Sequence, residues 1–424
     1  MRSVVSRLNS AMQVILKSES FSILVFCFYS FILLIPGGAS LFATLLVVLS
    51  VLVFLFLGPR RLGRSDQVFA LCLFAYPLLM IPSLLVKGGV WDFFDYPVRV
   101  LLFLPLILGL RGLANPASFQ KFLYLGCNIG GIFAAVFSIK SLLLDHIDRV
   151  GIPITASIAF GQIAAILGVI SFASIFESTS TSRKIIASLG FIGSAFAINS
   201  ASSTGALLGF IAGLVVLGLY RIRNQLLLSR PRNIILLFVI AFALVVPLAL
   251  KDFPRIYHDV FVAPPDSYMF TGQGHRLLLW GIAIKEIASS PLFGIGPGHF
   301  DHIIQGYCLK HFCVPDFAGY RGVHNQFLDS AMNAGIIGLI GLLVSYLGSL
   351  SLFVKRVINL NDNHTIQNAA VTGMAVISAG MVSCLSQVLY GHNISVISYY
   401  FTITFLWFLA DQPSVLRELD QRND

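Results

Sequence analysis

His324 is the residue in this sequence best suited to move a proton in a transfer reaction. It stands in the run His324-Asn325-Gln-Phe-Leu328-Asp329, directly ahead of a long apolar stretch. At helical spacing, His324, Leu328 and Ala331 share one face, which would place the imidazole on a rigid element at a membrane–water boundary. Such a histidine suits a general base that acts on a lipid-linked substrate. The competing interpretation is a histidine that only caps or anchors the helix at the interface.

Arg276 is a candidate for binding phosphate groups. It lies in the stretch from His275 to Glu286, whose pattern predicts an amphipathic surface helix with Arg276 and Trp280 on the same side. A guanidinium there could bind a phosphate or pyrophosphate through two parallel hydrogen bonds. The alternative is an arginine that reaches lipid headgroups beside an interfacial tryptophan. Arg149, which precedes another apolar stretch, has the same two interpretations.

Cysteines and glycines in the same polar segment suggest a metal site and a dinucleotide loop, but other features disfavour both. Cys308, His311 and Cys313 could join His302 in a metal site, but zinc sites need four well-placed ligands. A disulfide between the two cysteines is favoured, because the segment is expected to lie in an oxidising compartment. The glycine-rich run at 294–298 has no strand before it and no helix opening after it. It predicts a tight turn that redirects the chain rather than a dinucleotide loop.

The composition predicts a membrane protein. Of the 424 residues, 57% are hydrophobic and 11% are charged, whereas soluble domains carry about 25% charged residues. Apolar runs of about 20 residues, the length that crosses a bilayer core, recur along the chain. The first of these runs lacks a small-residue cleavage site, so no cleavable signal peptide is expected. We predict an all-α polytopic protein with about twelve transmembrane helices, near 21–37, 39–58, 67–86, 96–110, 119–139, 156–176, 185–199, 205–220, 233–250, 333–354, 367–388 and 395–410.

Basic residues predict how the chain is oriented. The net charge of +9 comes from short clusters between apolar runs, with no continuous patch that would bind nucleic acid. The clusters follow every second predicted span, and the positive-inside rule makes that side cytoplasmic. We therefore expect both termini in the cytoplasm and the remaining loops on the opposite, outer side of the membrane.

One outer loop is far longer than the others. We divide the chain into a membrane domain with spans one to nine (1–250), a periplasmic loop with short helices (251–332), and spans ten to twelve with a short cytoplasmic tail (333–424). The loop holds six of the nine histidines (His258, His275, His299, His302, His311 and His324). A long structured insertion between spans is usually functional, so we expect the chemistry there.

The motifs resemble those of the O-antigen ligase and O-antigen polymerase superfamily of bacterial lipopolysaccharide biosynthesis. The residues that carry this resemblance are Arg276, Trp280, Pro291, Gly294-Ile-Gly296-Pro-Gly298-His-Phe300, His324-Asn325 and Gly335-Ile-Ile-Gly338. Upstream, Arg149-Val-Gly151 with Ala159-Phe160-Gly161 is similar to the ligase branch. The resemblance implies a GT-C-type glycosyltransferase that uses no metal, nucleotide or other cofactor.

The resemblance also implies roles for individual residues. His324 would be the base that activates a sugar hydroxyl, while Arg276 and Arg149 would stabilise the leaving pyrophosphate. Trp280, Asn325 and Arg321 would complete the substrate-binding site. The family often has an arginine where this chain has Thr204, in the run Ser202-Ser203-Thr204-Gly205. A hydroxyl supplies no charge, so the resemblance requires Arg149 or Arg321 to compensate.

The implied donor is a glycan on undecaprenyl pyrophosphate, and the implied acceptor of a ligase is a sugar hydroxyl of lipid A–core. Direct displacement at the anomeric carbon would invert its configuration. The nearest alternative is an O-antigen polymerase, whose acceptor is a second lipid-linked glycan. An alternative from another class is a flippase or transporter of lipid-linked glycans. Transporters place polar residues inside their spans, whereas the predicted spans here are nearly free of charge, which favours an enzyme.

Overall fold

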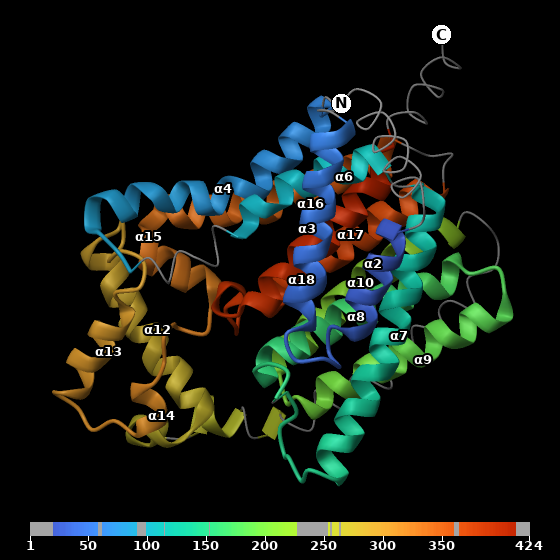
Figure 1. The fold of residues 1–424 in the computed structure, drawn as a ribbon. Coiled ribbons are helices and arrows are strands. Elements are labelled where there is room, and N and C mark those ends of the chain that lie inside the picture. Colours follow the sequence, from blue (N-terminus) through green and yellow to red (C-terminus); the bar gives the residue numbers. More distant parts are fainter. Residues whose placement is uncertain are drawn as a thin grey trace, which may run out of the picture.

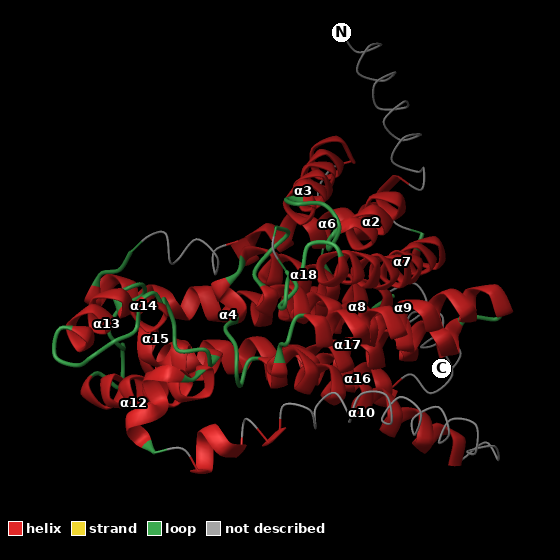
Figure 2. Ribbon diagram, turned by 90° about the horizontal axis from the view of Figure 1, so that it is seen from below, coloured by secondary structure: helices red, strands yellow, loops and turns green. Residues whose placement is uncertain are grey.

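The computed structural model of this protein describes residues 20–57, 62–90, 99–113, 115–151, 153–226, 253–254, 257–262, 264–359 and 364–412. Across these residues the chain forms helices and turns and no strand, which confirms the predicted all-α class. Long helices form a bundle, and a group of shorter helices lies at one end of it (Figure 1). The same separation is visible in a view from below (Figure 2).

The long helices come from both halves of the chain. In order they are α2 (Ser20–Phe31), α3 (Gly38–Leu57), α4 (Arg64–Lys87), α6 (Phe103–Leu113), α7 (Pro116–Leu143), α8 (Ser157–Glu177), α9 (Thr181–Ser200), α10 (Thr204–Leu226), α15 (Gln326–Leu343), α16 (Ser349–Asn359), α17 (His364–Ser383) and α18 (Asn393–Ala410). The remaining elements are η1 (Arg99–Leu102), η2 (His258–Val262), η3 (Pro265–Phe270), α12 (Gly272–Ser289), α13 (Phe300–Cys308), α14 (Pro315–Ala318), η4 (Val344–Gly348) and η5 (Leu389–Gly391). Buried aromatic and aliphatic side chains join the long helices into one core.

Eight described helical segments are long and apolar enough to cross a membrane, so the chain is a multi-pass membrane protein. The longest of them is continuous from α15 through η4 to α16. Three further predicted spans fall on α2, on η1 with α6, and on α9. With 12 and 11 residues, α2 and α6 are each shorter than the roughly 20 residues that a bilayer core requires. The predicted span at 233–250 lies outside the described residues, and the total of twelve stays a prediction.

Those members of the predicted basic clusters that the structure describes lie at one end of the bundle, here called the basic end. Arg111 donates to Asp66 (2.6 Å) and Asp411 (2.9 Å), and Arg356 also pairs with Asp411. These contacts bring together the start of α4 and the ends of α6, α16 and α18. Arg221 pairs with Glu177 at 3.4 Å, which adds the ends of α10 and α8. The charges are thus paired at the end of the bundle rather than within the apolar length of its helices.

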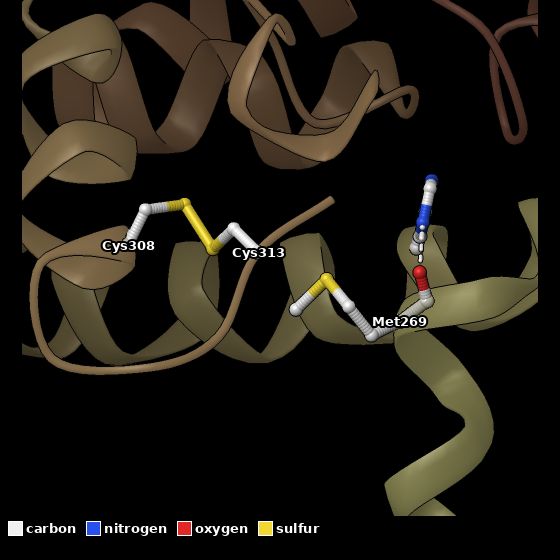
Figure 3. Close-up of a disulfide and its surroundings, with 4 residues drawn as sticks. Met269, Cys308 and Cys313 are labelled. Atoms are coloured by element: carbon white, nitrogen blue, oxygen red, sulfur yellow. Dashed lines mark hydrogen bonds between the residues drawn. A yellow bond between two sulfur atoms is a disulfide. The ribbon is translucent and has the colours of Figure 1, made fainter. Parts of the chain in front are cut away.

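At the opposite end, residues 264–325 form a small unit here called the outer module. Its helices α12, α13 and α14 surround their own core and pack on α15 through Met332. That core consists of Met269, Leu279, Ala283, Phe300, Ile304, Phe317, Val323 and Met332. Cys308 and Cys313 form a disulfide beside Met269, as predicted, so neither thiol is free to bind a metal (Figure 3).

The glycine-rich turn at 291–298 is wedged into a break in α15. Gly335 has φ 65° and ψ −162°, which interrupts the helix and frees the carbonyls of the preceding turn. Ile295 N–H donates to the Met332 carbonyl (2.8 Å), and Gly296 N–H donates to the Asn333 carbonyl (3.1 Å). The turn therefore supplies the hydrogen bonds that the broken helix loses, which matters because lipid offers none.

The spacing of Gly335, Gly338 and Gly341 predicts close packing of another helix along this stretch, but the three glycines have different roles. Gly341 faces Ala75 and Leu79 of α4, so it does allow close packing of another helix. Gly335 instead faces the Leu292 carbonyl of the inserted turn, and Gly338 faces only its own helix. The expectation of a helix-packing stripe was wrong for these two positions, because the turn occupies the space beside the first half of α15.

Candidate functional site

His324 occupies a strained position directly before α15. The helix begins at Gln326, and His324 has φ 52°, in the left-handed region that side chains other than glycine and asparagine avoid. The expectation that His324 shares a helical face with Leu328 was therefore wrong. Asn325 caps the helix, since its Oδ1 accepts from Phe327 N–H (3.0 Å) and Leu328 N–H (3.1 Å). Because Asn325 is the N-cap, α15 begins only after it, and His324 lies outside the helix.

Further contacts hold the backbone on both sides of His324. Trp280 Nε1–H of α12 donates to the Val323 carbonyl at 2.9 Å. Gln326 N–H donates to the carbonyls of Cys384 (2.9 Å) and Gln387 (3.1 Å), which follow α17. Asp329 accepts from Val323 N–H at 3.4 Å and is 2% exposed. Two predicted binding residues, Trp280 and Asn325, thus make contacts that position His324.

Arg276 and Arg149 reach the region of His324 from separate segments. Arg276 lies in the first turns of α12, where its Nη1–H donates to Gln273 Oε1 at 3.1 Å. Burial lowers the pKa of Arg276; Tyr320 opposes this effect and Arg149 adds to it. Burial also lowers the pKa of Arg149, which again interacts with Tyr320. Both guanidinium groups therefore act on the same tyrosine, which stands four residues before His324.

The loop that carries Arg149 is tied to the loop that precedes Thr204. Arg149 Nε–H donates to the Ala201 carbonyl (3.1 Å), and Val150 N–H donates to the Ser200 carbonyl (3.0 Å). Thr204 begins α10 a few residues later, and its hydroxyl makes no hydrogen bond with the other predicted site residues that the structure describes. The backbone just before Thr204 therefore holds the Arg149 loop in place. In this part of the site the positive charge is carried by Arg149 and not by residue 204.

Tyr320 was not predicted from the sequence, yet it stands between the two arginines and the histidine. Its ring meets that of His324 edge to face, with centroids 4.8 Å apart. His275 Nε2–H donates to the Met269 carbonyl at 2.8 Å (Figure 3). With that proton assignment, Nδ1 of neutral His275 can accept from the Tyr320 hydroxyl, 3.3 Å away. A chain of contacts from the outer module thus fixes the ring that packs on His324.

The environment keeps His324 neutral. Burial, together with the neighbouring side chains Arg276, His392, Arg149 and His275 in that order of effect, lowers its pKa from 6.5 to about 4. A neutral imidazole with a free lone pair can accept a proton, as a general base must.

A cavity of about 620 Å³ opens beside His324. Its polar lining residues are Asp301, Tyr320, Arg321, His324, Asp329, Tyr390 and His392. Arg321, a predicted binding residue, is exposed at this cavity. Arg276 and Arg149 do not line it, although both lie near enough to His324 to lower its pKa. His324 therefore lies near two cationic side chains and also lines an open cavity.

His392 is a further site residue that sequence reasoning missed. It lines the same cavity as His324, and burial lowers its pKa. It directly precedes α18, in the pair His392-Asn393, much as the pair His324-Asn325 precedes α15. The criterion that singled out His324, a histidine at the outer start of a span, would also have found His392.

In the part of the chain that the structure describes, no group of three histidine, cysteine or acidic side chains could hold a metal ion. His311, the histidine between the two disulfide cysteines, stacks on Tyr307 with ring centroids 4.4 Å apart.

Two comparisons with known proteins bear on this site. Residues 189–343 match the family model described as O-antigen ligase. The match includes Thr204, Arg276, Trp280, Arg321 and His324, and Arg149 precedes it. A protein of Haemophilus influenzae, described as an uncharacterized protein, is 24% identical over 390 residues, which cover 89% of this chain and 95% of that protein.

Proposed function

We propose that the protein is an O-antigen ligase, because residues 189–343 match the model of that family and the motifs of the chain resemble it. It transfers a glycan from undecaprenyl pyrophosphate to a sugar hydroxyl of lipid A–core, at the periplasmic face of the inner membrane. The fold is that of a GT-C-type membrane glycosyltransferase with both termini in the cytoplasm. The active site comprises the outer module and the loops that carry Arg149 and His392.

The first event is proton removal from the acceptor. The acceptor sugar occupies the cavity beside His324, and the neutral imidazole takes the proton of its hydroxyl as the oxygen attacks the anomeric carbon of the donor. The bond from that carbon to the pyrophosphate oxygen breaks, and its electron pair leaves with the pyrophosphate. Attack from the face opposite the leaving group inverts the anomeric configuration.

The arginines stabilise the charge that develops on the leaving group. Arg276 and Arg149 come from α12 and from the loop before α8, and both interact with Tyr320. Two planar guanidinium groups can bind the oxygens of one pyrophosphate, and their partial burial strengthens the attraction. Thr204 is not required to carry charge in this arrangement.

One observation carries the proposal most directly. His324 lies near two arginines and lines a cavity of about 620 Å³, large enough for a sugar. A flippase would need polar groups along a path through the bundle, whereas these groups gather at one end of it. The arrangement therefore supports a transferase with two separate substrates.

A reconstituted assay tests the function. Purified protein receives undecaprenyl pyrophosphate-linked glycan together with either lipid A–core or further donor. A ligase gives glycosylated lipid A–core only in the first mixture. Longer lipid-linked glycan in the second mixture would identify a polymerase instead. Absence of product in both mixtures, with donor translocation in vesicles, would identify a transporter.

Replacement of Arg276 by lysine tests the role of its guanidinium. We expect kcat/KM for ligation to fall by about 100-fold, because a point charge does not reproduce a two-pronged contact with pyrophosphate. The matched control is Arg223→Lys, an exposed arginine at the basic end. Unimpaired ligation by the Arg276 variant would show that this residue only anchors the helix to lipid.

The pH dependence of ligation tests the state of His324. A base with a pKa of about 4 is deprotonated at all higher pH values, so kcat/KM should hold down to about pH 5 and be halved near pH 4. Bound pyrophosphate neutralises the arginines, which raises the pKa of His324, so kcat should fall at a higher pH than kcat/KM. Activity recovered on return to pH 7 controls for unfolding. Equal midpoints near 6.5 would show that the rate is controlled by a group with an ordinary imidazole pKa, which contradicts a buried His324 with a lowered pKa.

A further inference from the structure

A second cavity lies at the basic end, remote from His324. It has a volume of about 410 Å³ and lies among α7, α8, α9 and α17. The residues that line it are Ala117, Gln120, Lys121, Tyr124, Leu125, Asn128, Ser174, Glu177, Ser178, Arg183, Ile186 and Thr365. Helix α8 connects the two regions, since Ser157 at its start contacts Arg149 and Glu177 at its end lines this cavity. Its 21 residues separate the two places by about 30 Å.

The electrostatics of this cavity favour an anion. Lys121 and Arg183 line it, and neither pairs with a carboxylate among the residues the structure describes. Both side chains are exposed, and the Lys121 Nζ lies 5.8 Å from the centroid of the Phe122 ring. The one acidic lining residue, Glu177, is paired with Arg221. The cavity therefore carries two cationic side chains whose charges are not balanced within it.

Helix N-termini add to this positive potential. Helix α9 begins beside Arg183, and the residue before its first turn, Ser180, makes no capping hydrogen bond. Thr365 lies in the first turn of α17. The free N–H groups and the positive dipole end of a helix attract anions.

A buried hydroxyl points to a ligand independently of the charges. Tyr124 lines the cavity and is 6% exposed, and its hydroxyl meets no described residue with the geometry of a hydrogen bond, although Gln120 and Thr372 lie close to it. A buried phenol hydroxyl without a hydrogen-bond partner costs free energy unless a bound group supplies that hydrogen bond.

Apolar side chains beside the cavity indicate what kind of anion binds. Ile186 and Leu125 form part of its wall, and on the adjoining surface of α9 Ile185 and Leu189 are 55% and 52% exposed. Such residues on a membrane helix face lipid chains. A ligand with a charged phosphate and a hydrocarbon tail would satisfy both parts of this site, whereas a free anion would use only the first.

We propose that this cavity binds the phosphate headgroup of an anionic membrane phospholipid from the leaflet opposite the active site. Lys121 and Arg183 contact the phosphate, the N-terminus of α9 donates to it, and the Tyr124 hydroxyl donates to a headgroup oxygen. The acyl chains lie along Ile186 and Leu189. The site lies among four helices of the bundle, α7, α8, α9 and α17.

Native mass spectrometry of the full chain in detergent tests the proposal, with phosphatidylglycerol, phosphatidylcholine and inorganic phosphate as probes. We expect phosphatidylglycerol to bind more tightly than phosphatidylcholine. Lys121→Gln combined with Arg183→Gln should weaken that binding by about 30-fold, at about fivefold for each lost charge near a membrane surface. Tyr124→Phe should weaken it by about fivefold, the effect of one lost hydrogen bond.

The matched control is Arg223→Gln combined with Lys355→Gln, which removes two exposed cations at the same end but outside the cavity. It should bind phosphatidylglycerol like the unmodified protein. Three outcomes would overturn the proposal: equal binding of the two phospholipids, an equal loss in the control, or displacement of phosphatidylglycerol by inorganic phosphate. The comparison of the two lipids needs no variant, so it decides the matter even if a variant does not fold.

Discussion

Replacement of His324 by asparagine is expected to lower kcat/KM for ligation by about 100- to 10,000-fold, the range for loss of a general base. Asparagine tolerates the left-handed backbone that His324 adopts, at φ 52°. It therefore keeps the turn before α15 while removing the proton acceptor. His324→Ala should be at least as inactive, with an added loss of stability from the strained backbone. The measurement is initial ligation rate in the reconstituted assay, together with a thermal unfolding midpoint for each variant.

The control for this prediction is His311→Ala. That histidine lies in the same outer module, is exposed, and stacks on Tyr307 away from the cavity. It should retain normal ligation. An asparagine variant of His324 that ligates normally would eliminate the residue as the base and would redirect attention to His392, the other histidine of the cavity.

Replacement of Gly335 by alanine is expected to destabilise the protein and abolish ligation together. At φ 65° and ψ −162° the backbone is open almost only to glycine, and a side chain there costs about 1–3 kcal/mol. The new Cβ would also lie 2.2 Å from the Leu292 carbonyl oxygen, so the inserted turn must move. Movement of that turn removes the hydrogen bonds to Met332 and Asn333 and displaces the outer module from α15. The thermal unfolding midpoint and the ligation rate should both fall.

Gly281→Ala is the matched control for this variant. Gly281 lies inside α12 with open space around its Cβ position, so alanine should leave activity unchanged and stabilise the helix slightly. If Gly335→Ala unfolded at the same temperature as the unmodified protein, the break in α15 would not depend on glycine. Both variants replace glycine by alanine, but only Gly335 has a positive φ and a crowded Cβ position. A difference in stability between the two variants therefore comes from the conformation and surroundings of Gly335.

The sequence predicts the bundle and part of the site, because both depend on patterns close together in the chain. Apolar runs locate the long helices, and the pattern around Arg276 locates α12 with its tryptophan on the side of Val323. The two cysteines are five residues apart, which suffices to predict their disulfide. These are local properties, and a single stretch of residues determines each of them.

The remaining features depend on contacts between distant residues. Tyr320 has no distinctive neighbours in sequence, and its place in the site follows from His275 and from two arginines on different segments. Gly294 and Gly335 look like ordinary turn and helix-packing glycines, yet each faces the backbone of the other's segment. His324 lies outside the helix because Asn325 caps it. A helical pattern drawn through both residues conceals that cap.

The break in α15 has a consequence for how the chain enters the membrane. The carbonyls of Met332 and Asn333 are left without helical partners by Gly335, and residues 295 and 296 supply those partners. Synthesis proceeds from the N-terminus, so the glycine-rich turn leaves the ribosome and reaches the far side before α15 does. When α15 arrives, its partner is already in place, and the interrupted helix need never face lipid with bare carbonyls. The order of these segments along the chain thus matches the order in which insertion requires them.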